Sequence, residues 1–260
     1  MQLGFVGTGE ITFSMVTGLN LEGVSRPYFI RLSPRNARIA SELANRFKEI
    51  SIASCNQGVL DQSDTVVIAV RPQAARVVLS ELHFRPDHHV VSLVSALSLQ
   101  SLSELVAPAV RITRAVPLPS AAKRLSATAI YPPDRAACEL FAALGTVFPV
   151  ESEKEFAAMC ATTATIASYF AYTERIASWL VEQGVPESKA RDYVARLFFG
   201  LTATAADAPE RSFQSLAANH ATAGGINERF LRHLIERGFL TSVSEGLHAI
   251  LHSIGASEKP

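Results

Sequence analysis

A glycine-rich turn stands at the start of the chain, where Gly7-Thr8-Gly9-Glu10-Ile11-Thr12 directly follows an apolar run. The first glycine permits a tight turn, and the second lets the backbone come close to a pyrophosphate. A helix beginning there would offer unpaired N–H groups to the anion. The pattern predicts a dinucleotide-binding loop formed by Gly7, Thr8, Gly9, Glu10 and Ile11, with the Glu10 side chain turned away from the phosphates.

The segment after the second predicted strand indicates which dinucleotide the predicted site would bind. An NAD site needs an acid there to bind the ribose hydroxyls, and residues 23–41 contain no Asp or Glu. The arginines of this stretch are Arg26, Arg31, Arg35 and Arg38. Ser33, Arg35 and Asn36 would offer a hydroxyl, a guanidinium and an amide to a 2′-phosphate. We therefore expect NADP(H), with a basic, solvated helix start as the alternative.

A further loop is predicted where the apolar run Thr65–Val70 ends at Pro72. In an open parallel sheet, ligands bind beyond the carboxyl ends of the strands. Ala69, Val70, Arg71 and Pro72 are therefore expected beside the cofactor.

The elements that must position these residues alternate along the first part of the chain. Strand-like runs lie at Leu3–Val6, Tyr28–Leu32, Thr65–Val70, His89–Leu93 and Arg111–Ala115, with weaker ones near Ile50–Ala53, Ala127–Tyr131 and Thr146–Val150. Helical patterns such as Asn36–Phe47 and Ala74–Leu82 separate them. Apolar strands alternating with helices indicate a parallel sheet covered on both faces. The adjacent His88 and His89 are expected in a solvated turn just ahead of a strand.

Strand patterns stop at about Glu151. Helical stretches follow at Glu153–Gln183, Pro186–Ala206, Pro209–Ala218 and Asn227–Ser253. We therefore expect two domains, residues 1–151 and 152–260. The first helix carries only Glu174 and Arg175 as charged residues between Ala157 and Trp179. Such a helix needs burial on all sides, which predicts a partner subunit.

Composition excludes several classes of function. The 24 basic and 24 acidic residues balance, so no overall field attracts nucleic acid or an anionic membrane. The three cysteines are widely spaced and no Cys or His pair has the spacing of metal ligands, which argues against a disulfide framework and a structural metal. No signal core or membrane-spanning pattern is present. We expect a cytoplasmic protein without a metal, nucleic-acid or membrane partner.

Taken together, these segments resemble the pyrroline-5-carboxylate reductases over nearly the whole chain. The family's start is similar to Gly4–Gly9, its A-V-K-P-Q loop to Ala69–Gln73, and its small-residue strand end to Ser92–Ser98, which includes Ser95. Its late T-S-P-G-G-T-T loop corresponds to Ala221–Asn227. The resemblance implies an α/β Rossmann-type N-terminal domain with a parallel sheet, followed by an all-α C-terminal dimerisation domain, and a homodimer or higher homo-oligomer.

The resemblance also assigns roles in the site. In the family the late loop holds the substrate carboxylate with backbone N–H groups and hydroxyls. This predicts substrate contacts at Gly224, Gly225 and Ile226, with Leu118 added from the M-P-N-T-P loop. Thr222 and Asn227 are predicted to be catalytic. His220 could orient or protonate the substrate, but a helix-end residue that caps carbonyls is the favoured alternative.

This chain departs from the family's pattern around the substrate. Leu118 replaces the asparagine of M-P-N-T-P, Thr162–Ala167 replaces S-G-S-G-P-A, and Ile226-Asn227 replaces paired threonines. The implied reaction is NADPH-dependent reduction of a cyclic imine acid, 1-pyrroline-5-carboxylate or a relative. Two alternatives stay open, a diverged NADP-binding protein without turnover and an imine reductase of secondary metabolism with a different substrate.

Overall fold

The computed structural model describes residues 1–23 and 28–256. Arg26, one of the four arginines expected near the cofactor, lies outside the described residues. The chain divides into two compact units. The first is Met1–Ala161 together with the end of the chain from Leu251, and the second is Thr162–Ile250. Each unit is described by itself below.

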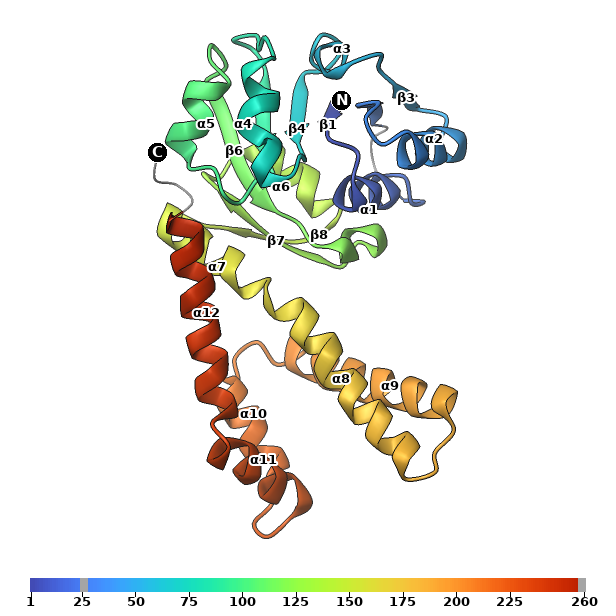
Figure 1. Ribbon diagram of the computed structural model, residues 1–260, viewed down its shortest axis with the longest axis vertical. Coiled ribbons are helices and arrows are strands. Elements are labelled where there is room, and N and C mark those ends of the chain that lie inside the picture. Colours follow the sequence, from blue (N-terminus) through green and yellow to red (C-terminus); the bar gives the residue numbers. More distant parts are fainter. Residues whose placement is uncertain (24–27, 257–260) are drawn as a thin grey trace. The chain divides into compact units, whose positions relative to one another are not determined.

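The first unit is built on one eight-stranded sheet among the described residues (Figure 1). Its strands are β1 (Gln2–Val6), β2 (Phe29–Leu32), β3 (Ile50–Ile52), β4 (Thr65–Ile68), β5 (His89–Ser92), β6 (Arg111–Val116), β7 (Ser126–Tyr131) and β8 (Gly145–Pro149). The strand order is β3-β2-β1-β4-β5-β6-β7-β8. The order reverses between β1 and β4, so a crevice for a ligand is expected beyond the carboxyl ends of these two strands.

Helices cover both faces of this sheet, as the alternating pattern predicts. They are α1 (Glu10–Leu19), α2 (Ala37–Arg46), α3 (Asn56–Leu60), α4 (Pro72–Ser80), α5 (Leu99–Leu105), the 3₁₀ helix η1 (Pro119–Lys123), α6 (Arg135–Ala142) and α7 (Glu153–Thr162). Buried side chains of α1, α2 and α6 pack in one apolar cluster, and those of α3, α4 and α5 pack in another. Both clusters include strand residues such as Phe5 and Val66, so the sheet is apolar on each face.

The prediction of a parallel sheet is wrong at one pair of strands. β6 and β7 are antiparallel, with Ala115 opposite Ile130, whereas β7 and β8 are parallel again. The segment between β6 and β7 holds only the short η1 helix. A parallel return needs a crossover of about a dozen residues or more, usually with a helix, so this short link turns the chain back on itself.

His88 and His89 do not lie in a solvated turn, contrary to the prediction. His88 and His89 are 0% and 2% exposed, and His89 already belongs to β5. The ring of His88 accepts the Arg85 N–H at Nδ1 and lies 3.1 Å from the Leu60 carbonyl at Nε2. These bonds allow the His88 ring to be buried, because both of its ring nitrogens have partners.

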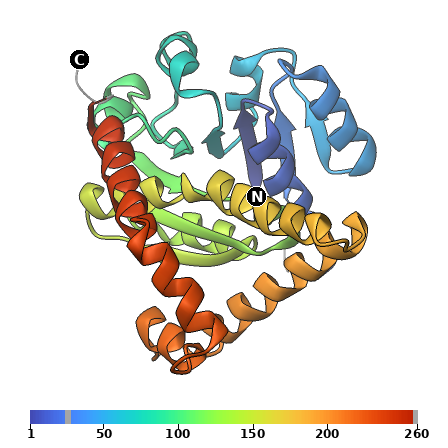
Figure 2. The same cartoon turned by 60° about the horizontal axis from the view of Figure 1, so that its bottom comes forward.

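The second unit is entirely helical in its described residues. It contains α8 (Thr165–Glu182), α9 (Glu187–Ala206), α10 (Phe213–His220), α11 (Ile226–Glu236) and most of α12 (Phe239–Ala256). Figure 2 shows α8 and α9 joined by a short turn, and Gly184 belongs to the segment between them. The last turns of α12 belong to the first unit, where Ile254 packs against a small cluster that includes Phe156 and Cys160.

Three of the predicted helices have different bounds. The stretch Glu153–Gln183 is broken between α7 and α8, where the Thr165 hydroxyl donates to the Thr162 carbonyl at 2.7 Å and competes with the helical bonds. The stretch Asn227–Ser253 ends its first helix at Gly238, whose φ of +74° is the usual left-handed helix stop. Instead of Pro209, the helix of the third stretch starts at Phe213, because the Ser212 side chain caps it.

No helix in the described part of the chain is both long and apolar enough to span a bilayer.

Candidate cofactor and substrate site

Gly7 makes the turn that follows β1. Its φ is +102°, and a Cβ on it would stand 2.5 Å from the Ala69 carbonyl oxygen. The Thr12 hydroxyl donates to the Gly7 carbonyl at 2.7 Å, so the first turn of α1 is tied to the loop. Thr12, bulkier than the small residue usual there, is fully buried in this role. Only glycine fits the loop at residue 7.

Ser33 and Thr8 fix the loop from beneath. The Gly7 N–H donates to the Ser33 hydroxyl at 2.9 Å, and the Thr8 hydroxyl donates to the Ser33 carbonyl at 2.8 Å. Ser33 is 0% exposed. Its hydroxyl, predicted to face a 2′-phosphate, therefore lies under the loop, where it joins the end of β2 to the turn after β1.

Gly9 leaves the N-terminus of α1 open. It is the N-cap in an extended conformation without a side-chain cap, and a Cβ on it would find no chain atom within 4 Å. The Phe13 N–H makes the first helical bond, to Gly9, so the amides of Glu10, Ile11 and Thr12 have no helical acceptor. The Glu10 side chain is 80% exposed and lies 3.9 Å from Arg38. This helix start can receive an anion.

Arg35 and Asn36 have different roles at the start of α2. The Asn36 side chain accepts the Ile39 N–H at 3.4 Å and caps the helix. Arg35 is exposed and makes no ion pair within the described ranges, while Arg38 pairs with Glu42. Of the three groups predicted around a 2′-phosphate, the guanidinium of Arg35 is the one that stays available.

The loop after β4 lies next to the glycine turn. The Ala69 N–H donates to the Val6 carbonyl at 2.8 Å, which joins the two loops at the carboxyl edge of the sheet. Val70 is half-buried, the exposed Arg71 is the N-cap of α4, and Pro72 opens that helix. The predicted residues Ala69–Pro72 thus share one edge with Gly7 and Gly9.

Ser95 is held by a buried arginine that sequence reasoning missed. Arg114, in β6, is 1% exposed; it donates to the Ser95 carbonyl at 3.0 Å and to the Glu153 carboxylate at 2.7 Å. The same Glu153 oxygen accepts the Leu99 N–H, and the guanidinium stands 4.6 Å from the centre of the Phe156 ring. The only clue in the sequence is a cation inside an apolar strand, which is costly to bury unless it is paired.

Leu118 lies just beyond the carboxyl end of β6. It is half-buried, its N–H donates to the Ser126 hydroxyl at 2.9 Å, and η1 begins at the next residue. Leu118 therefore lies on the same edge of the sheet as the glycine loop and the loop after β4.

The remaining predicted residues form one loop of the second unit, between α10 and α11. His220 is exposed in the last turn of α10, and its carbonyl accepts the Asn227 amide at 3.0 Å. Thr222 and Ile226 are exposed, and the Thr222 carbonyl accepts the Gly225 N–H at 2.8 Å. All of these residues thus lie in this loop or at its two ends.

One carboxylate of this loop was not predicted. Gly224 has a φ of +74°, and its N–H donates to Glu228 Oε2 at 2.6 Å. Glu228 is the third residue of α11, so its side chain can reach back to the loop before the helix. A glutamate three residues after the helix cap is a known sequence pattern, which could have revealed this contact.

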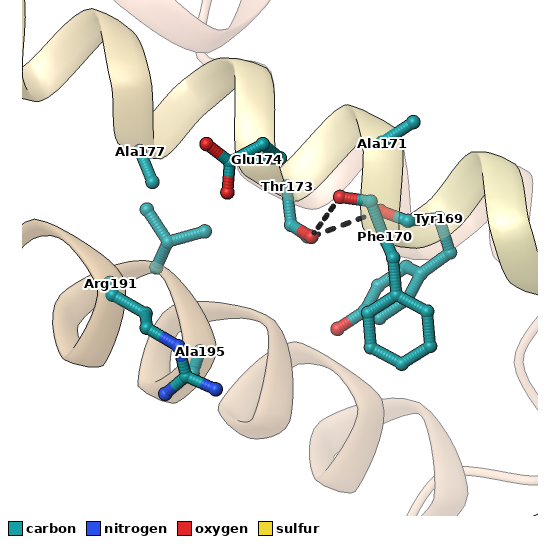
Figure 3. Close-up of a pocket in the computed structure, with 9 residues that line it drawn as sticks. Tyr169, Phe170, Ala171, Thr173, Glu174, Ala177, Arg191 and Ala195 are labelled. Atoms are coloured by element: carbon teal, nitrogen blue, oxygen red, sulfur yellow. Dashed lines mark hydrogen bonds between the residues drawn. The ribbon is translucent and has the colours of Figure 1, made fainter.

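Two grooves mark the surface of the second unit. One of about 500 Å³ lies between α8 and α9, where Figure 3 shows Glu174 and Arg191 on opposite walls beside Tyr169 and Phe170. A larger one of about 820 Å³ lies between α8 and α12 and is mostly apolar, with Tyr172 and Phe239 in its lining. No residue of α8 is buried within the chain. An apolar helix with such grooves is typical of a surface that a partner covers.

Within the described ranges, no group of three or more His, Cys, Asp or Glu side chains could hold a metal ion.

Two families of known proteins match separate parts of the chain. Residues 2–97 match the model of the family described as NADP oxidoreductase coenzyme F420-dependent, and residues 153–255 match the model of pyrroline-5-carboxylate reductase dimerisation. The first match covers β1 to β5 with the glycine loop, and the second covers the helices from α7 to α12.

Relatives and solved structures match nearly the full length. The pyrroline-5-carboxylate reductase of Vibrio alginolyticus is 24% identical, covering 99% of this chain and 98% of its own. The structure of 1-pyrroline-5-carboxylate reductase from Streptococcus pyogenes has a TM-score of 0.84 at 24% identity, covering 98% of both chains. The Plasmodium falciparum pyrroline carboxylate reductase with NADP bound has a TM-score of 0.83 at 18% identity, covering 100% of this chain and 98% of that one.

The likeness to these structures establishes the fold, a Rossmann-type α/β domain followed by helices. The glycine loop, the helical region with its dimerisation match and the end-to-end relatives point the same way. The chain is similar to pyrroline-5-carboxylate reductases over nearly its whole length, and its residues 153–255 match their dimerisation family.

Proposed function

We propose that this protein is an oxidoreductase that reduces the carbon–nitrogen double bond of a small cyclic imine with NADPH, the reference substrate being 1-pyrroline-5-carboxylate. The observation that carries the proposal is the open helix start at Gly9, set at the reversal of strand order in a chain that is similar to pyrroline-5-carboxylate reductases. Such a helix start binds phosphate groups through its amides.

The residues present fit an NADP(H) molecule. The amides of the first turn of α1 face an open space above Gly9, where a side chain would stand in the way of a pyrophosphate. Arg35 would pair with the 2′-phosphate, since a guanidinium binds phosphate in a fork geometry. Ser33 and Asn36 would act indirectly, Ser33 by shaping the loop and Asn36 by fixing the start of α2 next to Arg35.

NADPH supplies a hydride when it is bound. The chain's own task is to hold and orient the reacting groups. Ala69–Pro72 and the Ser95 segment would do so at the carboxyl edge of the sheet, with Ser95 fixed by Arg114. A cyclic imine is basic enough to be partly protonated near neutral pH, so a dedicated acid is not required. Thr222, Asn227 and His220 are the proposed substrate contacts in the loop before α11, with Leu118, Gly224, Gly225 and Ile226 lining the substrate site.

We also propose that the chain acts as a homodimer, residues 1–151 binding the cofactor and residues 152–260 serving dimerisation and substrate binding. The exposed, largely apolar α8 supports this, because obligate interfaces resemble a protein core. A cytoplasmic location goes with the proposal, supported by the sparse and widely spaced cysteines.

The proposal is tested by following NADPH absorbance at 340 nm with a panel of cyclic imines. The expected result is oxidation of NADPH that depends on an imine and is faster with NADPH than with NADH. Binding of NADPH without oxidation in the presence of any cyclic imine would favour the diverged, non-catalytic alternative and overturn the proposal.

A further inference from the structure

The loop before α11 is hydrogen-bonded to a carboxylate of the same chain, that of Glu228. The Glu228 carboxylate accepts the Gly224 N–H at 2.6 Å, a short and charge-assisted bond. The neighbouring Gly225 N–H is also occupied, by the Thr222 carbonyl. The two backbone donors that two adjacent glycines would otherwise present to a ligand are thus used inside the chain.

Glu228 is well placed to stay there. As the third residue of α11 it lies at the positive end of the helix dipole, and Arg232, one turn later, stands 3.4 Å from the same oxygen. The Asn227 amide is turned back to the His220 carbonyl, which holds the other side of the loop. Moving the Glu228 carboxylate away from Gly224 would therefore break favourable contacts with Gly224 and Arg232 and cost free energy.

We propose that Glu228 is a specificity-determining residue, which competes with a substrate carboxylate and makes the site favour cyclic imines that lack one. This inference rests on the proposed function and selects one class of substrate within it. An incoming carboxylate would have to displace Glu228 from Gly224 or bind beside it at the amides of Ile226 and Asn227. In the second case two negative charges would stand close together, which disfavours binding.

An uncharged imine meets no such repulsion. Its protonated form, an iminium cation, is attracted by the same carboxylate, so Glu228 also favours the form of the substrate that accepts hydride most readily. The replacement of the family's paired threonines by Ile226 and Asn227 agrees with this selection, because two hydroxyls that would bind a carboxylate are absent.

The test compares 1-pyrroline with 1-pyrroline-5-carboxylate in the full-length protein with NADPH. Glu228→Gln keeps an oxygen that can accept the Gly224 N–H but removes the charge. Glu236→Gln, in the last turn of the same helix and about 12 Å further along it, is the matched control. The expected result is that the wild type prefers 1-pyrroline, and that Glu228→Gln raises the kcat/KM ratio of carboxylated to uncarboxylated imine about tenfold, equivalent to one favourable charge contact.

A second readout avoids turnover. Calorimetry with pyrrole-2-carboxylate and pyrrole, in the presence of NADP, should show tighter binding of the acid to Glu228→Gln and no change in Glu236→Gln. Reduction of both imines with a ratio that Glu228→Gln leaves unchanged, or a wild-type preference for the carboxylated imine, would overturn the role of Glu228 and leave the proposed function intact. Reduction of neither imine by any of the three proteins would instead contradict the proposed function.

Discussion

Gly7 is needed for the backbone of the loop, and Gly9 is proposed to leave room for the cofactor. Substitution with alanine should therefore have different effects at the two positions. A Cβ at Gly7 would collide with the Ala69 carbonyl, whereas one at Gly9 meets nothing within the chain. We expect Gly9→Ala to keep its Tm within about 2 °C, since surface changes without lost contacts are nearly neutral, yet to bind NADPH at least about tenfold more weakly. Gly58→Ala, in α3, is the control. Unchanged NADPH binding by Gly9→Ala would place the pyrophosphate elsewhere.

Arg35 is the residue proposed to make the site bind NADPH in preference to NADH. Arg35→Ala should weaken NADPH binding by about 1–3 kcal/mol, the value of a charge-assisted phosphate contact, and leave NADH binding nearly unchanged. Arg46→Ala, at the other end of α2, serves as the control. Dissociation constants from fluorescence titration provide the check. An equal loss for both cofactors would mean that Arg35 does not recognise the 2′-phosphate.

Single residues show what the sequence could reveal about the site and what it could not. The glycine spacing and the arginines were readable because their chemistry depends on residue type alone. The task of Ser33 was not, since its hydroxyl is used by a residue 26 positions away. The burial of His88 and His89 and the contacts of Arg114 likewise depend on partners that only the folded chain brings within reach. The contact of Glu228 is local and follows a known pattern at helix starts.

At the scale of elements, all eight strands of the described residues fall where apolar runs predict them. The apolar run of β7 did not reveal its direction, because such a run is equally compatible with parallel and antiparallel pairing. The short link after β6 was the available sign of antiparallel pairing. The helices were readable by their periodicity, but their breaks were not. The step from α7 to α8 depends on a threonine hydroxyl bonding to backbone, and the stop after α11 depends on Gly238 adopting a positive φ.

His89, in β5, is expected to make the free energy of unfolding depend on pH. Burial lowers the pKa of His89 to about 4, although Asp134 stands 3.7 Å away. The unfolded chain, with a His pKa of about 6.5, therefore binds more protons than the folded chain between pH 6.5 and 4. Stability should fall by up to about 3 kcal/mol as the pH drops through this window.

His89→Gln should flatten this part of the curve of unfolding free energy against pH, measured by urea denaturation. Burial alone would raise the pKa of Asp134, but bonds from Arg111 and the Ala137 N–H hold it at about 2. Its contribution is therefore lost only at lower pH, from about 4 down to 2, and should persist in the variant. A variant as sensitive as the wild type between pH 6.5 and 4 would exclude His89 as the titrating group.

At the scale of the whole molecule, the exposed apolar residues are the feature that one chain does not explain. Tyr169, Phe170 and Trp179 on α8 are 45%, 63% and 51% exposed. A second copy covering this helix would make it the core of an interface, as the match to the dimerisation family leads us to propose.

Ala167→Asp places a carboxylate on this face of α8. In a dimer it would be a buried charge without a partner and cost several kcal/mol, so the dimer and the activity should be lost together. Ala37→Asp, on the exposed side of α2, should leave the mass unchanged. Light scattering of the unmodified protein and both variants is the check. An unmodified protein that is a stable monomer at micromolar concentration, with full activity, would show that α8 needs no partner.

Hydride transfer from NADPH to a carbon–nitrogen double bond can be followed through the transferred atom itself. NADPH carrying deuterium on both positions of nicotinamide C4 is incubated with the protein and a cyclic imine, and the amine product is examined by mass spectrometry. We expect one deuterium in the product, on the carbon that was doubly bonded to nitrogen. Product without deuterium, or no amine product from any cyclic imine, would contradict it.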